Sequence, residues 1–537
     1  SEAGQVDFPE ETVLSRGRIE AGGILYYDHS LKKVFNTPEA LSSLAEKRQY
    51  GLLLKKARFK ISDIPDNEDA TDKSPLHYDG DLNRNARYVA YSHNQESFRF
   101  LMDPMLESGL EKVSAMGYGN AINALSDNEG GVAKYFSQRF AQVTNPPLDS
   151  IREADGMTLR LALGEKPGNV TQCSQQIIIE SPLLSYSDIL KISSQDMVPV
   201  GFFDALFEPV ANNFEQNKES LISGIESLCD EVENFVKKNG GIAIVSDRQV
   251  CKSKAAIPMV LATSAINQRL IEAGVRLKVS LIVESGQISS SHHIACVLGF
   301  GAAAVYPLAV QMRSEEKFGA DAGSHFTKFA KAAEKSLMKT MGKVGLCTVE
   351  SYSSGEFFEP NFLDVSDPVL AKYFPSMKSP VGGVGFLAVA QAASDWHERA
   401  LSVFEPSDIP MLGLFKERSE GAGHSYGATA VRGFVDLTEE PITLEKLGTS
   451  ENKTAMRLFT LDKMTDAFGL DDKSYSNTSF EKISKKDINN FEITPGFRDF
   501  SRMMKEERER RPAALRDVLA FPADISYMNS ISDITKE

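Results

Sequence analysis

Three charged residues of this sequence stand where apolar runs end. Asp247 and Arg248 follow the run Gly241–Ser246, and Glu284 follows the run 277–283. Carboxylates beside a guanidinium can pin loops through ion pairs, or they can bind and polarise a substrate when burial shifts their pKa values. The residue types alone fit both roles, so this cluster is both a candidate site and a candidate structural lock.

A second pair of polar side chains, Thr144 and Asn145, directly precedes two prolines, Pro146 and Pro147. Proline disfavours the helical conformation of the residue before it and has a fixed φ angle, so the segment is predicted to be extended and stiff. The hydroxyl and the amide would then stand at fixed positions and could donate or accept hydrogen bonds. A helix-terminating turn, with Asn145 bonded to its own backbone, explains the same residues.

Histidines and cysteines give little indication of a metal site. His292 and His293 are adjacent, and neighbouring helical side chains point about 100° apart, so helix-start hydrogen bonding is the simpler interpretation. The chain has 5 cysteines, widely spaced and without a Cys-X-X-Cys motif, so neither a disulfide framework nor an iron–sulfur site is expected. Cys296 and Cys347 lie in apolar runs and are predicted to be buried.

A parallel sheet would bring the three charged residues together. The runs Gly241–Ser246 and 277–283 predict strands, and an apolar helical stripe over 257–265 lies between them. A helix that joins two strands implies parallel, right-handed pairing, and the pattern repeats through 290–298 and 302–306. The sequence therefore predicts a βαβαβ unit with the charged residues on its carboxyl edge.

Composition limits the classes of function. With 537 residues the chain can hold two to four domains of ordinary size. Its 59 Lys and Arg against 74 Asp and Glu give a net charge of −15, the wrong sign for a general nucleic-acid or anionic-membrane binder. No run approaches the ~20 apolar residues of a membrane span, and no basic segment followed by an apolar one opens the chain. A soluble, cytoplasmic protein with neither partner is expected.

Several segments resemble one enzyme family. VESGQISSSHHIACVLGFGAAAVYP, residues 283–307, is similar to the central domain of the large chain of glutamate synthase. Residues 135–153, YFSQRFAQVTNPPLDSIRE, are the most specific match through Gln-Val-Thr-Asn-Pro-Pro, and the segments 116–120 and 351–359 keep part of the family's motifs. The resemblance covers nearly the whole chain.

The resemblance implies a domain organisation. Residues 1–35 would be the C-terminal strands of a glutamine amidotransferase domain, and 36–437 the central domain. Residues 438–490 would be a polar linker or insertion, and 491–537 a helical lead-in to a flavin-binding domain not present in this chain. The implied fold class is α/β, a rudimentary (β/α) barrel-like domain with parallel βαβ units, plus a short antiparallel β segment at the N-terminus.

The resemblance also implies a function, as part of an enzyme that forms glutamate from glutamine and 2-oxoglutarate. Its partners would be the amidotransferase and flavin-binding domains of the same enzyme, and Thr144 and Asn145 would line the ammonia tunnel. This chain would hold no catalytic residue, no metal and no cofactor, with FMN and an iron–sulfur cluster in the remainder of the enzyme. Two other classes remain open: a non-catalytic interaction or scaffold protein, favoured by altered motif positions at Tyr118, Ser353 and Ser354, and an independent α/β-barrel enzyme.

Overall fold

The computed structural model describes residues 8–65, 77–111, 130–139, 152–167, 174–210, 213–353, 357–375, 377–379 and 382–413, with a few positions beyond. Thr144 and Asn145, Tyr118, and the proposed linker 438–490 lie outside the described residues. No helix within the described ranges is both long and apolar enough to cross a membrane.

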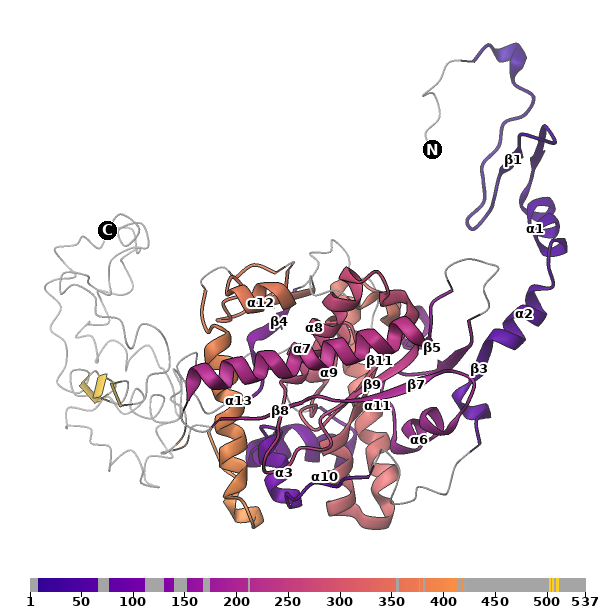
Figure 1. The fold of residues 1–537 in the computed structure, drawn as a ribbon. Coiled ribbons are helices and arrows are strands. Elements are labelled where there is room, and N and C mark those ends of the chain that lie inside the picture. Colours follow the sequence, from indigo (N-terminus) through magenta and orange to yellow (C-terminus); the bar gives the residue numbers. More distant parts are fainter. Residues whose placement is uncertain are drawn as a thin grey trace, which may run out of the picture.

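A 4-stranded parallel sheet forms the centre of the body (Figure 1). Its strand order is β12 (Ala304–Pro307), β11 (Val279–Ser285), β9 (Gly241–Ser246) and β7 (Val200–Asp204). A parallel bridge between Leu183 and Val305 continues the sheet beyond β12. Every residue of β9, β11 and β12 is buried, as expected for parallel strands that are covered on both faces.

Three helices connect the successive strands: α7 (Phe214–Lys238), α8 (Met259–Glu272) and α9 (Ser291–Gly299). α7 packs on α8 and α8 on α9, so the three lie side by side on one face of the sheet. The rings of Phe203 on β7 and Phe235 on α7 lie 5.5 Å apart, centroid to centroid. The predicted βαβαβ unit is therefore confirmed, with parallel register from β9 to β11 and from β11 to β12.

Local sequence explains where these helices begin. The side chain of Asn213 accepts from Gln216 N at the start of α7, and Ser290 accepts from His293 N at the start of α9. Both bonds satisfy amides that the first helical turn leaves unpaired. α7 then buries one stripe of its surface against the sheet: Leu221, Ile225, Leu228, Val232 and Val236.

Shorter elements surround the sheet. A 3-stranded sheet, β3 (Arg58–Lys60), β6 (Gln176–Ile179) and β5 (Leu161–Gly164), meets the amino ends of the parallel strands, where Gly164 N donates to Ser280 Oγ at 3.0 Å. Two antiparallel pairs join β4 (Phe136–Gln138) to β13 (Phe358–Pro360) and β8 (Leu206–Phe207) to β10 (Ala255–Ala256). The remaining body helices are α3 (Arg84–Ala90), a π-helical turn at Ser97–Met102, α4 (Asp103–Ser108), α5 (Glu153–Gly156), α6 (Tyr186–Ser194), α10 (Leu308–Phe318), α11 (Ala322–Val344), α12 (Pro368–Tyr373) and α13 (Phe386–Leu401).

The N-terminal part is an arm that extends away from the body (Figure 1). It contains an antiparallel hairpin of β1 (Tyr26–Asp28) and β2 (Lys33–Phe35), followed by α1 (Thr37–Glu46) and α2 (Tyr50–Ala57). The short antiparallel segment expected at this end is therefore present.

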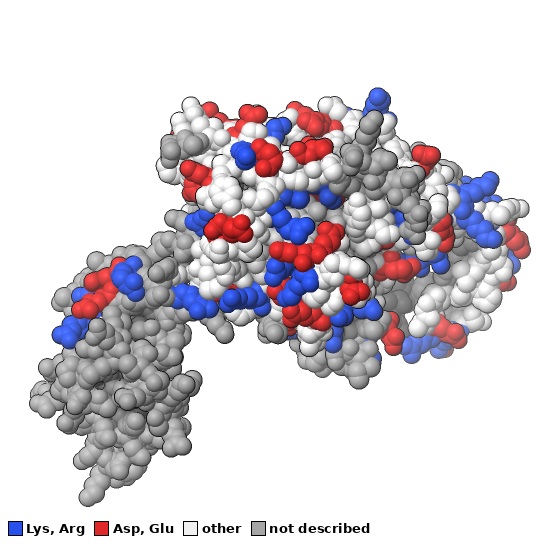
Figure 2. All heavy atoms as spheres, turned by 90° about the horizontal axis from the view of Figure 1, so that it is seen from below, with Lys and Arg blue, Asp and Glu red and all other residues white. Residues whose placement is uncertain are grey.

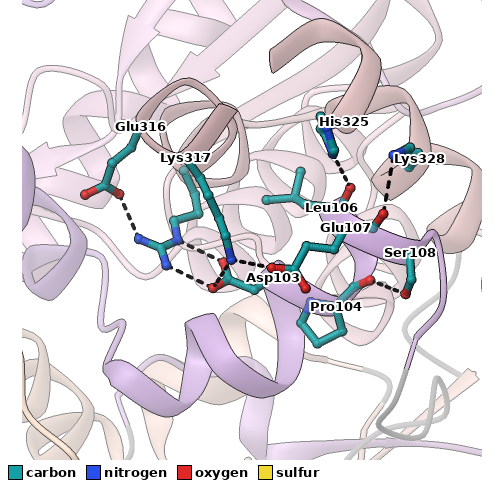
Figure 3. Close-up of polar contacts among 10 residues, drawn as sticks. Asp103, Pro104, Leu106, Glu107, Ser108, Glu316, Lys317, His325 and Lys328 are labelled. Carbon is teal, nitrogen blue, oxygen red and sulfur yellow. Dashed lines mark hydrogen bonds and ion pairs between the residues drawn. The ribbon is translucent and has the colours of Figure 1, made fainter. Parts of the chain in front are cut away.

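An ion-pair network joins α4 to α10 (Figure 3). Arg313 binds Asp103 through two parallel bonds, Nε to Oδ1 and Nη2 to Oδ2, each of 2.9 Å. Lys317 Nζ donates to Asp103 Oδ2 at 3.0 Å, and His325 Nδ1 on α11 lies 2.8 Å from Leu106 O. A bidentate arginine–carboxylate pair has a defined geometry, so this network fixes α4 and the preceding π-helical turn on the body.

On the face shown in Figure 2, Asp and Glu side chains are interleaved with Lys and Arg over the described part of the body. Charges of mixed sign are typical of a solvated protein surface.

Candidate functional site

A row of polar side chains crosses the carboxyl edge of the parallel sheet. The register places Asp204 beside Ser246, Ser246 beside Glu284, and Glu284 beside Tyr306. Residues in register on parallel strands point to the same face. The row therefore lies on the face opposite to the one on which Phe203 meets α7.

A buried ion pair lies within this row. Arg248 Nε donates to Glu284 Oε1 at 2.7 Å, and Ser246 Oγ donates to the same oxygen at 2.7 Å. Arg248 is 7% exposed and Glu284 1% exposed. Burial opposes the charge of the guanidinium, but the adjacent Glu284 carboxylate outweighs burial and raises the pKa of Arg248 above its usual value. Arg248 Nη2 and Glu284 Oε2 are buried without a hydrogen-bond partner among the described residues.

Asp247 binds the loop after β11 rather than the ion pair. One carboxylate oxygen accepts from Gly286 N at 2.8 Å, and the other accepts from Ser285 Oγ at 2.5 Å and from Gln287 Nε2 at 3.0 Å. Burial raises the pKa of Asp247 to about 6, although these three hydrogen bonds favour the ionised form. The predicted cluster is thus together at one edge, but it divides into an ion pair and a separate loop anchor.

Gln287 is a positioning residue that sequence reasoning missed. Its Oε1 accepts from Met259 N at 3.0 Å, at the start of α8, and its Nε2 also donates to Ile257 O at 2.8 Å. The loop after β11 therefore holds the amino end of the preceding helix. A glutamine in a loop has no local pattern that indicates this role.

Two buried histidines, His93 and His292, and the partly buried His293 lie behind the same loop. His93 Nε2 is 2.6 Å from Gly286 O, and His292 Nε2 is 2.9 Å from Ala133 O. Burial lowers the pKa of His93 to about 4 and that of His293 to about 3, so both imidazoles are neutral near pH 7. In the described part of the chain, no group of three or more His, Cys, Asp and Glu side chains could hold a metal ion.

A cavity of about 50 Å³ adjoins these imidazoles. Its polar and charged lining includes Ser92, His93, Asn94, Ser97, Lys134, Gln287, Ser289 and His293. A neighbouring cavity of about 20 Å³ shares Ser92 and Gln287 with it. About 10–15 Å³ of such volume holds one water molecule, so the two cavities together have room for a few small polar guests.

The segment 130–134 forms one wall of the larger cavity. The same segment continues through β4, whose Gln138 accepts a hydrogen bond of 2.6 Å from the Tyr352 hydroxyl. Thr144 and Asn145 follow a few residues later, outside the described residues, so no position is assigned to them.

The glycine-rich turn before α13 is occupied by other residues of the protein. A Cβ atom on Gly383 would lie 2.1 Å from the carbonyl oxygen of Phe362, and Phe386 N already donates to Asp367 Oδ2 at 3.2 Å. A carboxylate therefore occupies the helix start where a phosphate would otherwise bind. These residues do not fit a flavin phosphate.

One of the two buried-cysteine predictions is wrong. Cys296 is buried in α9, as predicted, whereas Cys347 is exposed. α11 ends at Val344, and Gly345 adopts a left-handed conformation with φ of 92°, which turns the chain before Cys347. The apolar run there marks a helix end, and neither cysteine has an observed role.

Residues 86–362 match the family model described as "Glutamate synthase central domain". The chain is similar to the ferredoxin-dependent glutamate synthase of Cyanidium caldarium, with 30% identity covering 79% of this chain and 28% of that protein. The glutamate synthase [NADPH] large chain of Bacillus subtilis is 27% identical, covering 80% of this chain and 28% of that protein. The glutamate synthase [NADPH] large chain of Azospirillum brasilense is 26% identical, covering 86% of this chain and 30% of that protein. The chain thus spans less than a third of the length of these relatives. A mandelate oxidase structure aligns with a TM-score of 0.26 at 13% identity over 51% of this chain and 97% of that one, a likeness too weak to support an inference.

Proposed function

The chain belongs to the glutamate synthase central-domain family, and from this premise we propose that it is the connecting part of a glutamate synthase, which forms glutamate from glutamine and 2-oxoglutarate. The observation that carries the proposal is the extent of the family match. Residues 86–362 include all four strands of the parallel sheet and every described residue of the carboxyl edge.

Its role would be to link an amidotransferase domain to a flavin-binding domain of the same enzyme. We assign residues 1–35 to the former, 36–437 to the central domain, 438–490 to a linker or insertion, and 491–537 to the approach to the latter. The N-terminal arm supports this assignment, because Leu14, Leu25 and Leu31 are 100%, 62% and 67% exposed. Apolar side chains exposed to this degree are suited to packing against further protein.

The central domain would be a rudimentary (β/α) barrel. Strands β7, β9, β11 and β12 follow one another in chain order, and their connecting helices lie on one face, as in barrel folds. The segment at Leu183 extends the sheet on the β12 side.

The carboxyl edge of this barrel would be a structural lock rather than a catalytic centre. Asp247 is 0% exposed and Glu284 1% exposed, so neither carboxylate is open to a substrate. This burial argues against the alternative of an independent barrel enzyme that uses these residues. FMN and an iron–sulfur cluster would belong to other domains of the enzyme, where they would supply the electron transfer, while the residues of this chain hold the edge in place.

The central domain would also contribute to the passage of ammonia, with Thr144 and Asn145 as hydrogen-bonding stations. The cavity beside His93 and His293 supports this role, because these two imidazoles are uncharged near pH 7 and its size suits molecules as small as water. The segment 130–134 connects the cavity to the Thr144 loop along the chain.

The test is a Thr144→Val substitution in an enzyme that contains all three domains. Valine keeps the shape of threonine and removes its hydroxyl, so glutamine hydrolysis should become uncoupled from glutamate formation while the fold persists. The measurement is the ratio of glutamine consumed to glutamate formed by the synthase reaction. Thr327→Val is a matched control, because Thr327 is exposed on α11 and bonds only within its own helix. An unchanged ratio in Thr144→Val, with unchanged stability, would show that the loop is only a turn.

A further inference from the structure

An open groove of about 880 Å³ lies along β7 and the neighbouring turns of α7. Its walls include Phe202 and Asp204 of β7, Phe207 of β8, and Ser227 and Glu231 of α7. The buried residues of the carboxyl edge do not line it. The groove shares Asp204 with the row of polar side chains described above but is separate from the buried ion pair and from the loop that Asp247 binds.

β7 is the edge strand of the parallel sheet, and within the described ranges no strand pairs with its outer side. Backbone bonds at its two ends, accepted by Pro199 O and donated by Ala205 N, join it to β9. These bonds show that the odd-numbered residues of β7 make the backbone hydrogen bonds to β9, because the N–H and C=O groups of successive residues point to alternate sides of a strand. The N–H and C=O groups of Val200, Phe202 and Asp204 therefore point outward, away from the sheet.

The exposure of β7 agrees with an open edge. Every residue of β9 and β11 is buried, whereas in β7 only Phe203 is, and Asp204 is exposed. An unpaired strand edge is a ready template for pairing with another chain.

The groove is acidic, which limits what it can accept. Its ionisable lining consists of Asp79, Asp204, Glu208 and Glu231 against Lys254. The side chain of Asp204 makes no hydrogen bond or ion pair with any described residue. Burial, Glu231 and Glu284 raise the pKa of its carboxyl group above the usual value, although Lys254 partly opposes them. A carboxylate in acidic surroundings is stabilised by an added cation.

We propose that the outer edge of β7 and its acidic groove form a docking site for an extended, basic segment of a partner protein. The segment would add to the sheet as one more strand, with main-chain hydrogen bonds to Val200, Phe202 and Asp204. Its Lys or Arg side chains would bind Asp204 and Glu208, and its apolar side chains would contact Phe202. Strand addition of this kind draws affinity from the backbone and specificity from side-chain pockets. Charge complementarity selects a basic partner segment over an acidic one. The proposal goes beyond the assigned function and does not depend on it.

The first experiment measures binding of synthetic peptides to the full 537-residue chain by fluorescence anisotropy. The probe is a fluorescein-labelled peptide of eight residues that alternates lysine and threonine, and its counterpart alternates glutamate and threonine. The lysine peptide should bind and lose affinity as salt is added, and the glutamate peptide should not bind. Equal binding of both peptides, or binding of neither, would overturn the proposal.

Two further comparisons localise the site. Asp204→Asn should weaken binding of the lysine peptide about threefold to tenfold, whereas Glu272→Gln, which removes an exposed carboxylate at the end of α8 outside the groove, should leave it unchanged. Backbone N-methylation of all lysines removes the N–H donors on one side of the extended peptide, and N-methylation of all threonines removes those on the other side. One methylated peptide should fail to bind and the other should bind as the parent does. If both bind equally, the contact is electrostatic without strand addition, and the proposal is wrong.

Amide hydrogen exchange shows whether the peptide binds at β7 itself or elsewhere on the protein. The amides of Phe202 and Asp204 should exchange more slowly when the lysine peptide is bound, because their outward N–H groups gain acceptors. Protection of other segments without protection of these two amides would refute docking at β7.

Discussion

Replacing Glu284 with glutamine should destabilise the fold strongly. The carboxylate is 1% exposed and is the one acidic group in hydrogen-bond contact with Arg248 among the described residues. Glutamine keeps the shape of the side chain and removes its charge, so a guanidinium that is 7% exposed would be buried without a counter-charge. Breaking a buried pair in this way costs about 3–5 kcal/mol, a large part of the ~5–15 kcal/mol by which domains are stable.

Urea unfolding measures this loss. The chain has 1 tryptophan, Trp396, which is 2% exposed on α13, so its fluorescence reports on unfolding of the body. The Glu284→Gln variant should unfold at lower urea with an unchanged slope of free energy against denaturant. The double variant Arg248→Met/Glu284→Gln should recover at least half of the loss, because no unpaired charge remains.

An exposed ion pair provides the control. Lys166 and Glu350 form a pair whose side chains are 41% and 46% exposed, so Glu350→Gln should cost about 0–1 kcal/mol. If Glu284→Gln costs no more than this control, water reaches Arg248 in the folded protein. The carboxyl edge would then not be a buried lock.

Three further outcomes are expected. Below pH 6.5 the unfolded chain binds protons at His93 and His293, whereas the folded chain keeps both imidazoles neutral. Asp247 has the opposite effect, because its pKa is raised from 3.8 to about 6 and the folded chain therefore binds a proton there first. The net difference is about one proton, so stability should fall by about 1.4 kcal/mol for each pH unit from pH 6 to 4. Asp247→Asn removes the opposing contribution, and urea unfolding across this pH range should show a steeper loss. Gly286→Ala should lower the free energy of unfolding by about 1–3 kcal/mol, because its Cβ would lie 2.2 Å from a buried tyrosine ring. Gly323→Ala is the control and should not destabilise the protein, because nothing lies within 4 Å of its Cβ. Equal melting curves for the two variants would contradict this prediction. The purified chain should be colourless, and a flavin absorbance band near stoichiometric occupancy would count against the connecting-domain assignment.

The βαβαβ unit could be predicted because the residue patterns that specify it lie within short segments of the chain. Alternation over 277–283 and the helical stripe over 257–265 indicate a strand and a helix without reference to distant residues, and parallel pairing follows from the connection between them. The strand itself starts two residues later, at Val279, and Leu277 is exposed in the turn before it. The meeting of Arg248 and Glu284 then follows from register, since both stand at carboxyl ends of adjacent strands. The division of the cluster, with Asp247 bonded elsewhere, depends on loop geometry that no periodicity encodes.

The histidine-lined cavity could not be predicted from sequence. His93 bonds the carbonyl of Gly286, which is 193 positions away along the chain, and nothing around His93 indicates that partner. The exposure of Cys347 was mispredicted for a related reason. An apolar run looks the same in a core strand and after a helix end, and only tertiary packing distinguishes them.

The order of strands in the parallel sheet also has a consequence for synthesis of the chain. Because β7, β9, β11 and β12 are neighbours in the same order in space and along the chain, each strand leaving the ribosome can pair with the one made just before it. The bridge from Leu183 to Val305 is different, since its first partner must wait until the last strand of the sheet has been made. The nascent protein therefore grows its sheet in one direction, and the long-range contact at Leu183 comes last.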